Sequence, residues 1–215
     1  MKICGKNNKN SVKYYQHFER VNEFAIAMEL CDGNLIDFIK FKKDLDIDDM
    51  YELLSQLNNT FKIMKENKIA HRDIKLQNIL VKYENIEKTK YTFKISDYGV
   101  GKEFSSFSSR FSTKVGTINF MAPEILEGKI YNNECDLWSL GVITYKLYFK
   151  SYPYLGESEI ALKNQIKKHG KKILSSSGNK NFDDLVRGLL TSIPDERLTW
   201  EQYFNHPFFK NKLFT

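Results

Sequence analysis

The chain has 215 residues, of which 41% are hydrophobic and 28% charged, so its length suits one large domain with a packed core. It carries 33 basic and 27 acidic side chains, a net charge of +6, yet no run of like charge is long enough for a nucleic-acid-binding arm. We therefore expect no nucleic-acid partner. The lysine excess is interpreted as a solvated surface, with a role in holding a phosphorylated ligand as the alternative.

The three cysteines, Cys4, Cys31 and Cys135, are far apart and odd in number, which indicates neither a disulfide framework nor a zinc site. The N-terminus contains no apolar run of the kind found in a signal peptide. The longest apolar-rich segment, 137–149, is too short to span a bilayer and contains Lys146. We therefore expect a protein without a membrane span, located in the reducing, intracellular environment of the cytoplasm.

The first elements in chain order are two strands, 12–19 and 24–30, joined by a polar turn at 20–23. Asp32 and Gly33 predict a turn that leads into a short amphipathic helix. A longer helix follows, and Asp46 and Asp48 suit its N-terminal end. Its apolar residues recur at spacings of three and four, at Met50, Leu53, Leu54, Leu57, Phe61 and Met64.

Two more strands are predicted at 78–83 and 91–96, on either side of the polar loop 84–90. The rest of the chain is predicted to be helical at 123–126, 133–148, 157–168, 181–190 and 199–203. The predicted layout is therefore two pairs of β-strands followed by a mostly helical body.

The segment 69–81, IAHRDIKLQNILV, places several polar side chains between apolar ones beside a strand. Asp73 follows a helix, where its carboxylate can accept a proton from a hydroxyl group. Lys75 can neutralise a transferring phosphoryl group, and Asn78 offers an amide oxygen suited to a hard cation such as Mg²⁺. A salt-bridged turn between Arg72 and Lys75 is the structural alternative for Asp73.

A second ligand for the metal is predicted at Asp97, at the end of the next strand. Because an antiparallel hairpin brings the ends of its two strands together, Asn78 and Asp97 are expected to meet. Gly99 allows the sharp turn that follows Asp97.

The motifs HRDIKLQN, DYG, GTINFMAPE, DLWSLGVITY and PDERLTWEQYFNHPFF occur in this order. Together they resemble the eukaryotic protein kinase family in its serine/threonine branch, over about residues 10–209. The DYG and YFNHPFF segments are also similar to those of autophagy-initiating kinases. The resemblance implies an α+β, protein-kinase-like fold with a mostly helical C-lobe and two residual N-lobe strands.

The domain division that the resemblance implies is a residual N-lobe at 1–30, with its fourth and fifth strands, and a C-lobe at 31–215. The C-lobe would hold the catalytic loop at 71–78 and the activation segment at 97–124.

The family's catalytic roles carry over to matching positions. Asp73 would be the catalytic base, Lys75 would contact the γ-phosphate, and Asn78 would complete the catalytic set. Mg²⁺ would be held by Asn78 and Asp97. ATP would be held at the adenine by the gatekeeper Met28, by backbone groups of the hinge residues Glu29, Leu30 and Cys31, and by Leu80 beneath the ring.

Regulation is predicted at Arg72, which would bind a phosphate placed on Thr113 of the activation loop by an upstream activating kinase. Thr117 would lie near Asp73 and Lys75. A flexible serine-rich linker is the alternative interpretation of the segment around Thr113.

Other polar residues are interpreted as structural. We expect His71 to pack against Tyr98, which stands where the family usually has phenylalanine. Asp136 is expected to cap the backbone of the catalytic loop. Glu124 and Arg197 are expected to form a buried ion pair.

The family's Gly-rich phosphate loop, strand lysine and helix glutamate have no counterpart in the sequence. The chain is therefore expected to begin near the fourth strand of the fold. We further expect residues 1–30 to pack poorly on the helical body, or to rely on sequence missing from the chain, with an uncovered apolar face around Phe24, Ile26 and Met28.

Two functions remain open. The first is a serine/threonine protein kinase that transfers the γ-phosphoryl group of ATP to protein Ser/Thr hydroxyls, the chain being a truncated record of a longer active enzyme. The alternative is a catalytically impaired, kinase-like binding or scaffold module without the phosphate loop and the N-lobe lysine.

Overall fold

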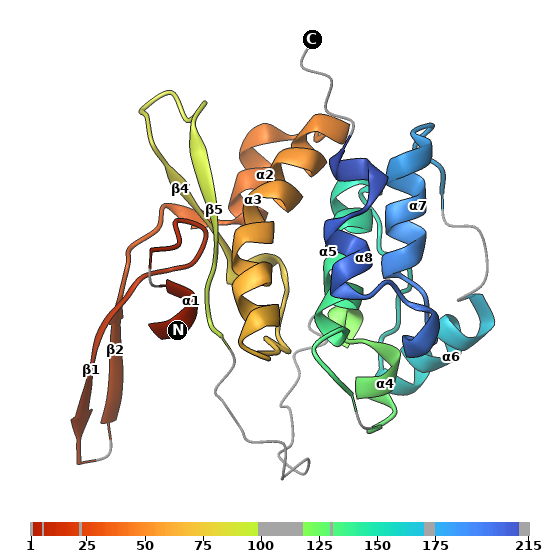
Figure 1. Cartoon of the computed structure of the whole chain (residues 1–215), viewed down its shortest axis with the longest axis horizontal. Coiled ribbons are helices and arrows are strands. Elements are labelled where there is room, and N and C mark those ends of the chain that lie inside the picture. The colour runs from red at the N-terminus through yellow and green to blue at the C-terminus, as the bar shows by residue number, and fades with distance from the viewer. Residues whose placement is uncertain are drawn as a thin grey trace.

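The computed structural model of the chain describes residues 2–5, 7–21, 23–98, 118–129, 131–169 and 175–210. Strands occupy the N-terminal side of the molecule and helices fill the remainder, as Figure 1 shows. The predicted α+β architecture with a mostly helical body is confirmed.

The strands are β1 (Tyr14–Arg20), β2 (Glu23–Met28), β3 (Gly33–Asn34), β4 (Ile79–Tyr83) and β5 (Tyr91–Ile95). The helices are α1 (Lys2–Gly5), α2 (Leu35–Lys42), α3 (Ile47–Glu66), α4 (Pro123–Leu126), α5 (Cys135–Phe149), α6 (Glu159–His169), α7 (Lys180–Leu189) and α8 (Trp200–Phe204). Short 3₁₀ turns occur at Leu76–Asn78, Ile118–Phe120, Pro194–Glu196 and Pro207–Phe209. The elements predicted from periodicity are all present, with ends that differ by a few residues. None of these helices combines the length and the apolar character that crossing a membrane requires.

The described strands form two small antiparallel sheets, a β1–β2 hairpin and a β3–β4–β5 sheet. The outer edge of β5 is covered by the segment just before β1. Its backbone bonds are Ile95 N–H to Asn10 O at 2.9 Å and Val12 N–H to Ile95 O at 3.0 Å, and Ser11 bridges to Ile95 in parallel. These bonds satisfy backbone groups that an open sheet edge would expose.

Helix α3 forms because its sequence supplies both a cap and an apolar stripe. Asp46 accepts a hydrogen bond from the backbone N–H of Asp49, and the Asp49 side chain accepts one from the backbone of Asp46, which makes a capping box. The stripe predicted from spacing is buried. It places α3 between the β4–β5 hairpin and helix α5 (Figure 1).

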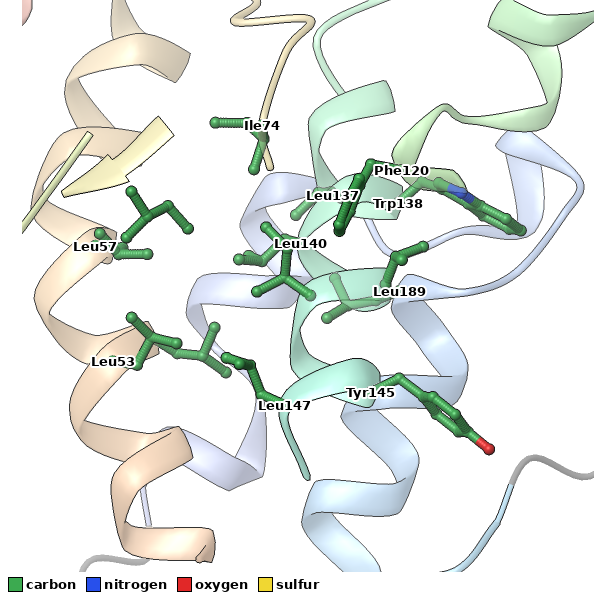
Figure 2. Close-up of a cluster of buried hydrophobic side chains, with 14 of the residues drawn as sticks. Leu53, Leu57, Ile74, Phe120, Leu137, Trp138, Leu140, Tyr145, Leu147 and Leu189 are labelled. Atoms are coloured by element: carbon green, nitrogen blue, oxygen red, sulfur yellow. The ribbon is translucent and has the colours of Figure 1, made fainter. Parts of the chain in front are cut away.

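Helix α5 is buried on almost every side and forms the centre of the helical body. In Figure 2, Leu53 and Leu57 of α3 point toward Leu140 and Leu147 of α5, and Leu189 of α7 lies on the opposite side. A side chain on Gly141 would lie 2.8 Å from Leu189 Cβ, so the close approach of α5 and α7 depends on this glycine.

The β1–β2 hairpin projects from the body with its apolar side chains exposed. Phe24 is 62% exposed and Ile26 is 41% exposed, while Met28 is half-buried at the end of β2. The expected uncovered face is therefore confirmed for the hairpin. The expectation that all of residues 1–30 pack poorly is wrong for Cys4 and Val12, which are fully buried, because the segment before β1 packs against β5 and α3.

Candidate active site

The loop that carries the predicted catalytic residues is anchored by Asp136, in the first turn of α5. One carboxylate oxygen accepts the backbone N–H of His71 at 2.7 Å and the other accepts that of Arg72 at 2.8 Å. Burial raises the pKa of Asp136 above its ordinary value, although the hydrogen bonds from His71 and Arg72 oppose this. The prediction that Asp136 caps the loop backbone is confirmed.

His71 is fully buried and connects this loop to the end of β5. Its Nδ1 accepts the backbone N–H of Asp73 at 3.3 Å, so its Nε2 is the atom that donates to Ser96 O at 2.8 Å. The ring centroid lies 5.4 Å from that of Tyr98. His71 therefore packs against Tyr98 as predicted, and its nitrogens are used for structure.

The three predicted catalytic residues lie in one hydrogen-bonded group. Lys75 Nζ lies 2.9 Å from Asp73 Oδ1 and 2.7 Å from Asp73 Oδ2, and Asn78 Nδ2 donates to Asp73 Oδ2 at 2.9 Å. Asn78 Nδ2 also donates to Asp73 O at 2.8 Å, which fixes the orientation of the amide. The Asp73 side chain is 39% exposed, so a substrate can reach its carboxylate.

The predicted metal ligands Asn78 and Asp97 lie on neighbouring backbone segments, but no hydrogen bond between their side chains is found among the described residues. Ser96 donates to Asn78 O through its backbone N–H at 2.9 Å and through its hydroxyl at 3.1 Å. Asp97 is exposed and has a φ of +52°, in the left-handed region that costs a residue with a side chain about 1–3 kcal/mol. Within the described ranges, no hydrogen bond or ion pair links the Asp97 carboxylate to Asp73, Lys75 or Asn78.

The donor atoms suit Mg²⁺. Asn78 uses its amide nitrogen toward Asp73, which leaves the amide oxygen for a cation, and Asp97 contributes an exposed carboxylate. Mg²⁺ is commonly bound by one or two protein oxygens together with substrate phosphates. A complete metal cluster of three or more His, Cys, Asp or Glu residues is not found among the residues that the structure describes.

The predicted adenine-binding residues lie on connected elements between β2 and β4. Backbone bonds hold the hinge at both ends, from Glu29 N–H to Lys13 O at 2.8 Å and from Asp32 N–H to Val81 O at 2.9 Å. Leu30 is 88% exposed and Cys31 is half-buried. Leu80 lies on β4 opposite Asn34 of β3, one residue from the hinge contact at Val81.

Sequence reasoning missed the role of the Glu29 side chain, which is 7% exposed. Its Oε2 lies 3.1 Å from Lys94 Nζ, and its Oε1 lies 3.1 Å from Lys82 Nζ. The burial of Glu29 tends to raise the pKa of its carboxyl, but the bonds from Lys94 and Lys82 outweigh this and lower it. The sequence alone gave no signal for this role, because it is the register of β4 with β5, in which Leu80 pairs with Lys94, that puts Lys82 and Lys94 on one face of the sheet.

The regulatory residues are only partly described. Arg72 has a φ of +67° and its guanidinium lies 5.6 Å from the centre of the Tyr131 ring. Thr113 and Thr117 fall outside the described residues, as does Gly99. The predicted phosphate contact of Arg72 therefore stays a prediction.

The chain matches the protein kinase domain over residues 2–209 and belongs to the protein kinase family. It is 32% identical over 203 residues to the serine/threonine-protein kinase TIO of Arabidopsis thaliana, with 94% of this chain and 15% of that protein covered. It is 32% identical over 224 residues to a putative serine/threonine-protein kinase, R517/R518, of Acanthamoeba polyphaga mimivirus, with coverage of 94% and 50%. The serine/threonine-protein kinase atg1 of Dictyostelium discoideum is 34% identical over 183 residues, with coverage of 84% and 26%.

Family membership therefore confirms the resemblance that the ordered motifs indicated. The chain spans between 15% and 50% of the length of the first relatives named here.

Proposed function

We propose that the chain is the catalytic part of an ATP- and Mg²⁺-dependent serine/threonine protein kinase. The observation that carries this proposal is the group formed by Asp73, Lys75 and Asn78, in which the Asp73 carboxylate is held at 2.7 Å by Lys75 and at 2.9 Å by Asn78. A structural turn would not require a carboxylate that is fixed on two sides and still 39% exposed.

In the proposed reaction, the hydroxyl oxygen of a substrate Ser or Thr attacks the γ-phosphorus of ATP. The bond from that phosphorus to the β,γ-bridging oxygen breaks, ADP leaves, and Asp73 accepts the hydroxyl proton. Lys75 would turn from Asp73 toward the γ-phosphoryl group and neutralise its charge. Mg²⁺, held by Asn78 and Asp97, would supply further charge neutralisation at the phosphates.

ATP would be held at the adenine through the backbone groups of Glu29, Leu30 and Cys31, with Met28 as gatekeeper and Leu80 beneath the ring. The hinge is supported for this role by its backbone bonds to Lys13 and Val81. In this proposal residues 1–30 belong to the N-lobe and residues 31–215 to the C-lobe.

We also propose that Thr113, phosphorylated by an upstream kinase, pairs with Arg72, and that Thr117 lies near Asp73 and Lys75. The three cysteines, all unpaired in the structure, support a reducing compartment, and we propose the cytoplasm. The protein substrate is proposed only by class, a Ser/Thr-containing protein.

A kinase-like binding or scaffold module remains the second candidate function. It is favoured by the exposed Phe18 and Phe24 on the β1–β2 hairpin.

The test is transfer of labelled phosphate from ATP–Mg²⁺ to a generic protein substrate, compared between the wild type and Asp73→Asn. We expect Asp73→Asn to lose about a hundredfold or more of the rate, the range for a general base. The matched control is Asp195→Asn, because Asp195 is an exposed aspartate in a distant 3₁₀ turn and should leave the rate unchanged. If the wild type binds ATP–Mg²⁺ but transfers no more phosphate than Asp73→Asn, the chain acts as a binding module.

A further inference from the structure

The residue that follows the predicted metal ligand Asp97 makes a contact that a phenylalanine in its place could not make. The Tyr98 hydroxyl donates to Ser11 Oγ at 2.5 Å, across 87 positions of sequence. Ser11 is fully buried and Tyr98 is half-buried.

Ser11 is a fixed partner because the segment that carries it is bonded on two sides. Its neighbours are tied to the backbone of Ile95, in β5, by the two bonds described above. On the other side, Thr60 of α3 donates to Asn10 O at 2.8 Å and accepts from the Asn8 side chain at 3.0 Å. The Ser11 hydroxyl therefore has a position set by both β5 and α3.

The backbone at Asp97 needs such support. Its left-handed conformation, with φ of +52°, persists only where the surroundings enforce it. On the preceding side, Ser96 is held by Asn78 and by His71. On the following side, Tyr98 packs its ring against His71, and its hydroxyl is bonded to Ser11 and also interacts with Thr60 of α3.

We propose that the Ser11–Tyr98 hydrogen bond is a positioning contact that holds Asp97 in its left-handed conformation, so that the affinity of the site for a divalent cation with a nucleotide depends on both hydroxyls. Tyr98 is a positioning residue here, because it acts through Asp97. The cation role of Asp97 rests on the proposed function. The dependence on Ser11 arises because this chain has a tyrosine at position 98 whose hydroxyl bonds to a serine at position 11.

The test compares Tyr98→Phe, Ser11→Ala and the double variant with the wild type. The probe is Mn²⁺ with a non-hydrolysable ATP analogue, and its dissociation constant is measured by electron paramagnetic resonance. We expect each single variant to weaken Mn²⁺ binding by up to about tenfold, since a buried hydrogen bond contributes about that much. The double variant should bind Mn²⁺ with the same affinity as whichever single variant binds it less tightly, because the two hydroxyls act as one contact.

The second readout is amide hydrogen exchange in the segment 93–98, which does not require bound metal or activity. Both single variants should exchange faster there than the wild type. The control is Thr144→Val, which removes a fully buried hydroxyl bonded within α5 and should change neither exchange in this segment nor Mn²⁺ affinity.

The outcomes separate this proposal from the proposed function. If Asp97→Asn weakens Mn²⁺–nucleotide binding but Tyr98→Phe and Ser11→Ala do not, the positioning role is wrong and the metal role stands. If the wild type and Asp97→Asn bind the probe equally or not at all, the metal role fails, and hydrogen exchange alone decides the positioning contact. Unchanged exchange in both single variants would overturn it.

Discussion

Arg197 and Glu124 form a two-bond ion pair in the interior of the helical body. Arg197 Nη1 lies 2.7 Å from Glu124 Oε1, and Arg197 Nη2 lies 2.8 Å from Glu124 Oε2. The Arg197 side chain is 0% exposed and the Glu124 side chain is 4% exposed. The pair joins α4 to the segment before α8, as the sequence predicted.

Breaking this pair from one side should be costly. Arg197→Met leaves the Glu124 carboxylate buried without its partner, so we expect the free energy of unfolding to fall by about 3–5 kcal/mol. Urea unfolding measures the loss. The control is Lys129→Met at the exposed Lys129–Glu127 pair, which should unfold like the wild type. A loss in Arg197→Met as small as that of the control would contradict the prediction.

The two lysines that contact Glu29 should differ in their effect on stability. Lys94 is 5% exposed and Lys82 is 44% exposed, so the solvent screens the Lys82 pair much more strongly. We expect Lys94→Met to lower the free energy of unfolding by about 3 kcal/mol and Lys82→Met by less than about 1 kcal/mol. Chemical unfolding of the two variants in parallel provides the measurement. Equal losses would show that the buried position of Lys94 is unimportant.

The stability of the chain should depend on pH through His206. Its Nδ1 accepts the Phe208 backbone N–H at 3.2 Å, and its Nε2 lies 3.3 Å from Asp184 Oδ2. Burial lowers the pKa of His206 below its ordinary value, and Asp184 opposes this. Since the unfolded chain then binds the proton more tightly, stability is full above about pH 6.5 and is lost as the pH falls toward the folded pKa.

His206→Asn keeps an acceptor for Phe208 but removes the titrating group. We therefore expect this variant to lose less stability than the wild type between pH 7 and pH 5, as measured by urea unfolding at each pH. Asp184→Asn should lose more stability than the wild type over the same pH range, because Asp184 no longer opposes the lowering of the His206 pKa by burial. Parallel pH profiles for the wild type and His206→Asn would rule out this contribution.

Cys31 gives a chemical test of the proposed adenine site. It is half-buried, whereas Cys4 is 0% exposed and Cys135 is 1% exposed, so it should be the first of the three to be alkylated. Burial raises the pKa of the Cys31 thiol, and the negative charges of Glu29 and Asp32 act in the same direction, so alkylation should be faster at pH 9 than at pH 7.

If the hinge binds adenine, ATP–Mg²⁺ should slow the alkylation of Cys31 several-fold, which mass spectrometry of the labelled peptide can follow. Cys31→Ser should remove the fast-labelling site. Equal rates with and without saturating nucleotide would argue against Cys31 lying at the adenine.

The site residues that sequence alone could predict are those with a short-range pattern. The order of HRDIKLQN, DYG and MAPE led to Asp73, Lys75 and Asn78, and the structure brings these three together. Helix positions followed from apolar spacing, as for α3 and α5. Local patterns such as these can be recognised in a sequence, because one helix turn or one loop fixes which side chains lie on the same face.

Contacts between distant segments that carry no family motif could not be predicted in this way. The apolar residues of β1 and β2 indicated an uncovered face, yet gave no sign that Asn10, Ser11 and Val12 would be buried against β5 and α3. The lysines that hold Glu29 looked like ordinary charged strand positions, since the pairing of β4 with β5 is needed to place Lys82 and Lys94 side by side.

The sequence by itself determined the family, the set of chemical groups and the helical body, because each depends on residue type at short spacing. Only the tertiary structure decided that Glu29 is shared by two lysines and that Tyr98 is bonded to Ser11. The physical reason is that a buried polar group must find its partner in space, and that partner is chosen by how the elements pack.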